Sequence, residues 1–364
     1  MASGYGMHST PVQFLDGGLG TCLEDAYGVH FSETTPLWSS HLLLSDHQTL
    51  ASCQHDFAKI PVDILLTATY QVSVEGFRRT QTDSFPNGVP RSEIPPFLDL
   101  AVAIAEQVKS PVTKLALSLG PYGAVMMPSQ EYSARYDDEH DSTEKLFRWH
   151  ADRMRLFAGI RRIDARVDFV AFETIPRLDE ILAIRKLTAL LASKSVDSDD
   201  SGGVGPLGRT PYWISCVFPD DNQVLPDGSS TDQVIRALLS LEHSDSVPWG
   251  IGINCTKIAR LPSLIQAYES GVRLLEYTGR LRSWPSLVLY PDGTNGEVYD
   301  TTTKTWVLAD CHTRVTESSW ECQLADIVTK ARSRRCWRSI VVGGCCKATP
   351  ADIARLRTEV FRAQ

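Results

Sequence analysis

Three cysteines occupy equivalent places in the sequence, each just after a short apolar run that precedes a predicted helix. Cys345 and Cys346 follow the run 339–342 and two glycines, and Cys255 ends the run 249–255. Adjacent cysteines form a strained disulfide with each other, but a backbone kink at the glycines would let both thiolates bind one metal ion. The residue types therefore predict one Zn²⁺ held by Cys255, Cys345 and Cys346, with a fourth position open for substrate or water.

The alternative is that these thiols only fill the core, since a free cysteine packs as a small hydrophobe. Their matching placement favours zinc. The other six of the nine cysteines show no such arrangement, and we expect them to be packing or surface residues: Cys22, Cys53, Cys216, Cys311, Cys322 and Cys336. The count is odd and the first ten residues do not resemble a signal peptide. We therefore expect reduced thiols in a cytoplasmic protein.

Composition restricts the class of partner. The 364 residues are 43% hydrophobic and 22% charged, which is typical of a globular protein with a large core. The net charge of −8 argues against nucleic acid or an anionic membrane as a partner. No apolar run has the length needed to span a bilayer. We expect small-molecule partners and, because no assembly pattern is visible, a monomer.

Eight apolar runs predict strands, and a helix or a helix-compatible segment follows each of them. The runs are 12–16, 63–69, 114–119, 168–173, 212–218, 249–255, 286–290 and 338–342. This alternation favours a parallel sheet, and eight units within one domain, 1–364, favour a closed (β/α)₈ barrel. An open doubly wound sheet is the second possibility. It would need a phosphate-binding glycine loop after the first strand, and residues 17–21 do not match GxGxxG.

Several reactive residues fall at the carboxyl ends of predicted strands, where barrels of this kind build their active sites. Asp16 is either a turn residue before two glycines or a ligand-binding carboxylate. Glu173 is either a helix-start carboxylate or a ligand-binding carboxylate, and its place after an apolar run favours the second role. Asn254 is either a loop cap or a residue that orients the zinc site. Two segments, 194–210 and 301–320, resemble surface insertions, and the first is expected to be flexible.

Seven short motifs, in order along nearly the whole chain, resemble homocysteine S-methyltransferases. They are Leu15-Asp16-Gly17-Gly18, Thr67-Ala68-Thr69-Tyr70-Gln71, Gly120-Pro121-Tyr122-Gly123-Ala124, Phe172-Glu173-Thr174-Ile175-Pro176, Gly252-Ile253-Asn254-Cys255-Thr256, Tyr290-Pro291 with Gly296-Glu297, and Gly343-Gly344-Cys345-Cys346. The resemblance implies a zinc-dependent barrel that moves a methyl group from a sulfonium donor, S-adenosylmethionine or S-methylmethionine, to homocysteine, forming methionine.

The resemblance also implies roles for single residues. The three cysteines would bind zinc. Asp16 and Glu173 would hold the amino acid, and we add Gly17, Gly18 and Asn254 to this substrate site. A second group would either line a donor pocket or simply fill the top of the barrel: Tyr70, Gln71 and Tyr122.

The sequence departs from the common family pattern in the loop after the seventh predicted strand, which reads Tyr-Pro-Asp-Gly-Thr-Asn-Gly where Tyr-Pro-Asn-Ser-Gly is usual. Loops supply the donor contacts, so donor choice stays open. One alternative is a methyltransferase that uses betaine, or another small thiol or selenol. Another is a catalytically silent barrel that binds zinc or a thiol, although the retained cysteines and carboxylates argue against it.

Overall fold

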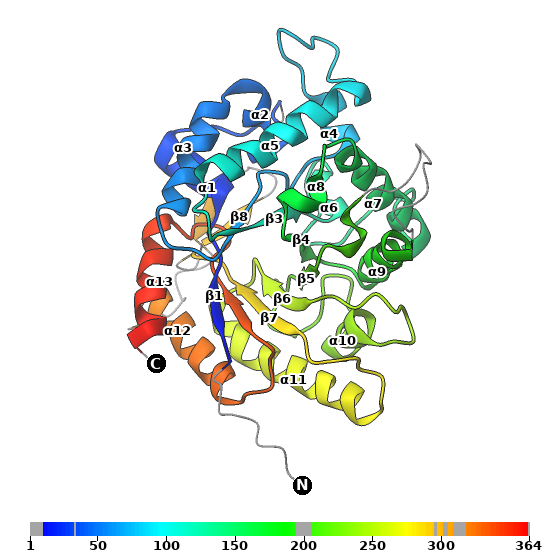
Figure 1. Ribbon diagram of the computed structural model, residues 1–364, viewed down its shortest axis with the longest axis vertical. Coiled ribbons are helices and arrows are strands. Elements are labelled where there is room, and N and C mark those ends of the chain that lie inside the picture. The colour runs from blue at the N-terminus through cyan, green and yellow to red at the C-terminus, as the bar shows by residue number, and fades with distance from the viewer. Residues whose placement is uncertain are drawn as a thin grey trace.

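Eight parallel strands form the centre of the fold, and helices surround them (Figure 1). The computed structural model describes residues 10–32, 34–193, 206–294, 297–300, 305–308 and 318–362. The strand order is β1-β10-β7-β6-β5-β4-β3-β2, and a parallel bridge from Leu15 to Ile64 joins the two end strands. The predicted (β/α)₈ barrel is confirmed. The strands are β1 Val12–Phe14, β2 Ile64–Leu66, β3 Lys114–Leu119, β4 Phe169–Ile175, β5 Tyr212–Cys216, β6 Gly250–Asn254, β7 Ser286–Tyr290 and β10 Ile340–Val342.

The longer helices alternate with the strands along the chain, as predicted: α3 His47–Ala58, α5 Ile94–Val108, α7 Thr143–Ala158, α9 Leu178–Ser193, α10 Thr231–Leu239, α11 Leu261–Tyr277, α12 Trp320–Ser333 and α13 Pro350–Arg362. Two of these helices begin at residue types that commonly cap helix N-termini. Asp46 accepts a hydrogen bond from the Thr49 amide at 3.0 Å, and Ser230 forms a capping box with Gln233 at the start of α10. Sequence reasoning missed α1 Leu19–Tyr27, α2 Leu42–Ser45, α4 Val74–Arg79, α6 Tyr122–Val125 and α8 Ile163–Arg166.

The central strands are buried on both faces, which explains why they read as continuous apolar runs. Large side chains fill the barrel interior, among them Phe169, Trp213 and Tyr290. The Trp213 indole donates to the Tyr290 hydroxyl at 3.3 Å, so the polar tips of two buried aromatic residues satisfy each other. This filling makes the interior a packed core.

The register of the strands brings distant segments to one edge. Phe14 pairs with Val342, Val342 with Leu289, and Leu289 with Ile253. Because all the strands are parallel, the residues that follow these four positions lie together at the carboxyl-terminal end of the barrel. The ends of β1, β6, β7 and β10 therefore meet, although they are up to 328 positions apart in sequence (Phe14 to Val342, 342 − 14).

The two predicted insertions fall partly outside the described residues. Residues 194–205 are outside them, and Pro206–Arg209 form a short 3₁₀ helix. In the second segment, 301–304 and 309–317, including Cys311, are outside. Its described part contains β9 Thr305–Leu308, which pairs antiparallel with β8 Glu297–Asp300, a hairpin that sequence reasoning did not predict. Among the helices that the structure describes, none is long and apolar enough to cross a bilayer.

Candidate active site

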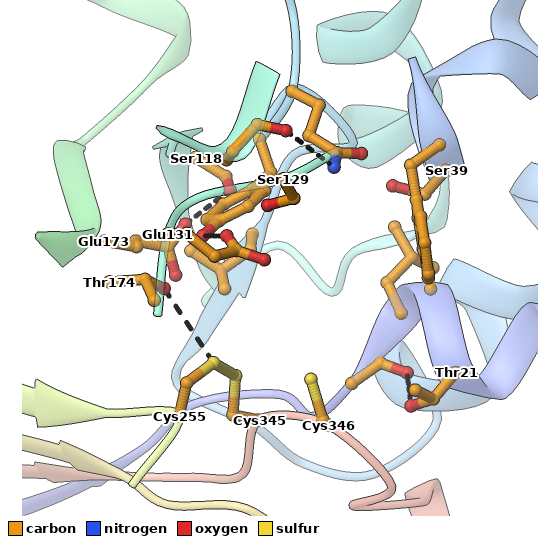
Figure 2. A pocket seen from close by; sticks show the side chains of 18 of the residues that line it. Thr21, Ser39, Ser118, Ser129, Glu131, Glu173, Thr174, Cys255, Cys345 and Cys346 are labelled. Carbon is orange, nitrogen blue, oxygen red and sulfur yellow. Dashed lines mark hydrogen bonds between the residues drawn. A yellow bond between two sulfur atoms is a disulfide. The ribbon is translucent and has the colours of Figure 1, made fainter. Parts of the chain in front are cut away.

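The three predicted zinc ligands meet at the carboxyl-terminal end of the barrel (Figure 2). Cys255 directly follows β6, and Cys345 and Cys346 follow β10. The sulfur atoms of these cysteines and a carboxylate oxygen of Asp292 all lie within 4.8 Å of one another. Thiolates and a carboxylate are ligands that zinc commonly takes, so this donor set fits the ion in type.

Asp292 is a member of this cluster that sequence reasoning missed. Its backbone is fixed from three sides. The Asp292 amide donates to the Thr256 carbonyl at 3.1 Å, the Trp320 indole donates to the Asp292 carbonyl at 2.8 Å, and the Gly293 amide donates to the Cys346 carbonyl at 2.7 Å. The signal was its position two residues after β7, beside the strands that carry the cysteines. Burial raises the pKa of the Asp292 carboxyl to about 7.

The structure joins Cys255 and Cys345 in a disulfide and leaves Cys346 free. The expectation that all the thiols are reduced is therefore wrong for this pair. Neighbouring parallel strands place the two residues with their Cα atoms 5.5 Å apart, which is the usual separation for a disulfide. The pair must be reduced before both sulfurs act as metal ligands, because a ligating thiol is deprotonated. Of the other cysteines, Cys22, Cys53 and Cys216 are buried, and Cys322 and Cys336 are half-buried.

Gly17 and Gly18 let the first loop approach the cysteine loop. The Gly18 amide donates to the Ala348 carbonyl at 3.0 Å. A Cβ atom at Gly18 would overlap the Cys345 carbonyl, and one at Gly17 would overlap the Ala348 carbonyl. Glycine is thus needed at both positions for close backbone packing. Both residues also line a cavity of about 570 Å³ above the cysteines.

Asp16 and Glu173 are buried carboxylates in the wall of the same cavity. One Asp16 oxygen accepts from the Leu66 amide at 2.9 Å, while within the described chain its other oxygen has no hydrogen-bond partner. Glu173 accepts a hydrogen bond from the Ser118 hydroxyl. Burial raises the pKa of Asp16 to about 8, with a further contribution from the Glu173 charge, and burial raises the pKa of Glu173 to about 7. A bound cation would therefore stabilise the ionised form of both carboxylates.

Asn254 connects the ends of β4 and β6. Its side-chain oxygen accepts from the Thr174 amide at 2.8 Å, and its side-chain nitrogen donates to the Thr174 hydroxyl at 2.7 Å. These two residues also approach the cysteine pair, with Thr174 Oγ1 at 3.8 Å from Cys255 Sγ and Asn254 Nδ2 at 4.0 Å from Cys345 Sγ. Thr174 has φ of 59° and Cys255 has φ of 46°, a left-handed conformation that is unusual for both residues. Asn254 thus lies where it can orient the cysteines.

The residues predicted for a donor pocket separate into two groups. Tyr70 and Gln71 line the cavity, with the Tyr70 hydroxyl donating to Glu131 at 2.6 Å and the Gln71 amide donating to the Ala124 carbonyl at 3.1 Å. Tyr122 is not among the lining residues, and its hydroxyl donates to Asp137. Sequence reasoning missed other lining residues, which come from a short 3₁₀ helix that begins at Trp38 and from the segment after α6: Trp38, Met126, Met127, Glu131 and Tyr132.

Comparisons with known proteins point to one family. A family model for homocysteine S-methyltransferase matches residues 13–360. The chain is 28% identical over 361 residues to homocysteine S-methyltransferase YbgG of Bacillus subtilis, across 95% of this chain and 93% of that protein. It is 26% identical over 346 residues to the betaine-homocysteine S-methyltransferase of Drosophila melanogaster, across 89% and 87%. The solved metallated form of the Escherichia coli homocysteine methyltransferase MmuM has a TM-score of 0.63 and 23% identity, across 95% of this chain and 96% of that one.

Proposed function

The chain belongs to the homocysteine S-methyltransferase family, enzymes that transfer a methyl group to homocysteine, and we propose that it uses a sulfonium donor and one zinc ion. The donor would be S-adenosylmethionine or S-methylmethionine, and the product methionine. The observation that carries the zinc proposal is the cluster of three cysteine sulfurs and the Asp292 carboxylate within 4.8 Å.

Cys255, Cys345 and Cys346 would hold the ion, with the Asp292 oxygen close enough to occupy the fourth position until substrate arrives. A zinc ion at this site would keep a bound thiol deprotonated at neutral pH, where a free thiol is mostly protonated. Asn254 and Thr174 fix the orientation of Cys255 and Cys345. Such outer contacts set ligand geometry in metal sites.

Asp16 and Glu173 would bind the ammonium group of homocysteine. The unpartnered Asp16 oxygen is a buried acceptor that an ammonium N–H would satisfy. No lysine, arginine or histidine is found among the residues that line the cavity, so within the described chain these carboxylates meet no competing cation there. Holding the amino acid at this end places its sulfur over the cysteines, where it faces the donor methyl group. This alignment is the main catalytic contribution of the protein.

No general acid is needed for this reaction. A sulfonium loses its charge when the methyl group leaves, so the leaving group is a neutral thioether. Tyr70, Trp38 and Tyr132 offer aromatic rings in the cavity wall, which suit a cationic donor.

The test is methionine formation from homocysteine in the presence of a thiol reductant, which opens the Cys255–Cys345 disulfide. S-adenosylmethionine, S-methylmethionine and betaine are offered separately, with and without a zinc chelator, and the metal content per chain is measured. We expect about one zinc per chain and turnover with a sulfonium donor that chelation abolishes. Cys346→Ser should lose both zinc and turnover, whereas Cys322→Ser, a half-buried cysteine on α12, should keep both.

Turnover that survives complete zinc removal would refute the metal proposal, and turnover with betaine alone would refute the sulfonium proposal. Methylation of other thiols or selenols, without methylation of homocysteine, would refute homocysteine as the acceptor.

We also propose that residues 1–364 form one domain and that the enzyme is monomeric and cytoplasmic. A single cooperative unfolding transition and a sedimentation mass near 40.3 kDa would support the first two points. Cell fractionation tests the third.

A further inference from the structure

The cavity contains a third carboxylate that the proposed mechanism does not use. Glu131 lies in the segment between α6 and α7, and it lines the cavity together with its neighbours Ser129 and Tyr132. In Figure 2 its carboxylate points into the space above the cysteines. It is only partly exposed, and that exposure is to the cavity.

Glu131 is separate from the Asp16–Glu173 pair. Glu131 accepts a hydrogen bond from the Tyr70 hydroxyl. Asp16 instead accepts from the Leu66 amide, and Glu173 accepts from the Ser118 hydroxyl. The cavity therefore has two anionic places around the thiols. One is formed by the strand ends that carry Asp16 and Glu173, and the other by Glu131.

The hydrogen bonds of Glu131 leave part of its acceptor capacity free. It accepts from the Tyr70 hydroxyl at 2.6 Å, whereas the neighbouring Ser129 hydroxyl donates to the Gly123 carbonyl at 3.2 Å. An ionised carboxylate has about four acceptor sites, so one donor does not satisfy it. Across the described ranges no lysine, arginine or histidine forms an ion pair with it, and burial raises its pKa to about 7. An enclosed carboxylate of this kind is stabilised by a cation that donates hydrogen bonds.

The segment that carries Glu131 is firmly held. The Gln130 amide donates to the Gly123 carbonyl at 2.8 Å, and the Ala134 amide donates to the Gln130 carbonyl at 2.9 Å. The buried Glu180 carboxylate holds both flanks, accepting from the Tyr122 amide at 2.8 Å and from the Tyr136 hydroxyl at 2.6 Å. Glu131 is thus preorganised, which lowers the entropy cost of binding a ligand.

The chemistry of the two substrates decides which cation fits. The homocysteine ammonium is assigned to Asp16 and Glu173, so Glu131 is left for the donor. A sulfonium centre has no N–H or O–H to donate, and aromatic rings suffice for it. An ammonium group has three donors, which matches the free acceptor sites of Glu131.

The energetics favour the same assignment. The sulfonium charge disappears during methyl transfer, so a carboxylate placed on it would stabilise the bound donor more than the transition state. The charge of an α-ammonium group does not change, and its binding contributes equally to both states.

We propose that Glu131 binds the α-ammonium group of the methyl donor, so that the enzyme selects amino-acid sulfonium donors over donors that lack an amino group. This inference rests on the proposed function and deepens it by naming the donor class. It predicts that Glu131 controls KM for such donors and leaves kcat nearly unchanged.

The test compares S-methylmethionine with 4-(dimethylsulfonio)butanoate, the same sulfonium without the amino group, at saturating homocysteine in zinc-loaded, reduced enzyme. Glu131→Gln should raise KM for S-methylmethionine by roughly 10- to 100-fold, because a charge-assisted hydrogen bond is lost. KM for the analogue should change less than about twofold, which is the built-in control for folding. Glu139→Gln, an exposed glutamate further along the same segment, should behave as wild type.

Equal losses with both donors, or no change with either, would overturn the assignment. Donor binding to the protein without homocysteine, measured by calorimetry, keeps this result independent of turnover. If the wild-type enzyme makes no methionine from any sulfonium, the proposed function fails. In that case the binding measurement alone tests the role of Glu131. An equal affinity of wild type and Glu131→Gln for S-methylmethionine would refute that role.

Discussion

Replacing Asn254 by alanine should destabilise the protein and weaken its metal site together. The Asn254 side chain is buried and makes two hydrogen bonds to Thr174. Each such bond contributes about 0.5–1.5 kcal/mol, and a buried amide left without an acceptor costs about 1–3 kcal/mol. The sum is about 2–6 kcal/mol of unfolding free energy. Asn222 lies on an exposed turn, so Asn222→Ala should lower the free energy of unfolding far less and serves as the control.

The same substitution should loosen the cysteines. Thr174 has a left-handed backbone, which costs about 1–3 kcal/mol and persists only where neighbours enforce it. Without Asn254, Thr174 would relax away from Cys255, and the contact from Asn254 to Cys345 would vanish. Loss of such outer contacts lowers metal affinity by roughly 10- to 100-fold in other sites.

Two assays follow these effects separately. Urea unfolding of the reduced, metal-free protein gives the change in stability, and competition with a chromophoric chelator gives the zinc affinity. A variant with lowered stability but wild-type zinc affinity would show that Asn254 only joins β4 to β6. Wild-type values in both assays would refute the reasoning entirely.

Three further predictions concern the carboxylates. Glu173→Gln should raise KM for homocysteine by roughly tenfold or more in steady-state assays, since a charge-assisted hydrogen bond to its ammonium group is lost; an unchanged KM would remove Glu173 from the substrate site. The metal-free, reduced protein should lose stability as pH rises from about 5 to 8. Folded Asp16 and Glu173 keep protons that the unfolded chain releases near pH 4, so each contributes a slope of about −1.4 kcal/mol per pH unit below its folded pKa. Urea midpoints should show a shallower slope for Glu173→Gln, and an identical slope would contradict the assignment. Glu180→Gln should release the flanks at Tyr122 and Tyr136, which limited proteolysis would detect as faster cleavage between them, while wild-type resistance would show that other contacts hold the segment.

The strands of the barrel were predictable because parallel strands are buried on both faces. Their sequences are continuous apolar runs, and most runs end at a polar residue, a glycine or a proline where the chain leaves the core. Parallel register then fixes which residues share an edge. This is why three cysteines from two distant segments could be brought together by sequence reasoning alone.

Helix α1 was missed because its start carries no capping signal. Gly18 is its N-cap residue and makes no side-chain hydrogen bond to the helix. The glycine-rich start therefore resembled a loop, whereas packing of buried residues such as Cys22 and Leu23 stabilises the helix in the fold. The strands β8 and β9 were missed because each has only four residues, and their segments were interpreted as a loop and a surface insertion.

Loop residues of the site were harder to predict than strand-end residues. Asp292 reaches the cysteine cluster and Glu131 reaches the cavity because of backbone contacts that have no local sequence pattern, such as the bond from Gly293 to the Cys346 carbonyl. The disulfide between Cys255 and Cys345 also depends on tertiary placement, because 90 residues separate the two cysteines.

The charges of the cavity suit a reaction in which two opposite charges disappear. In the proposed reaction a thiolate attacks a sulfonium, and the products are two neutral thioethers. Enclosing both charged reactants away from water would strengthen their attraction, because the effective dielectric constant is lower there. The cavity wall contains carboxylates that would bind the ammonium groups, whose charge is constant, and aromatic rings that would contact the sulfonium, whose charge is lost. Such a cavity would hold both reactants while favouring the step in which their reacting charges cancel, and the proposed reaction would then need no proton donor.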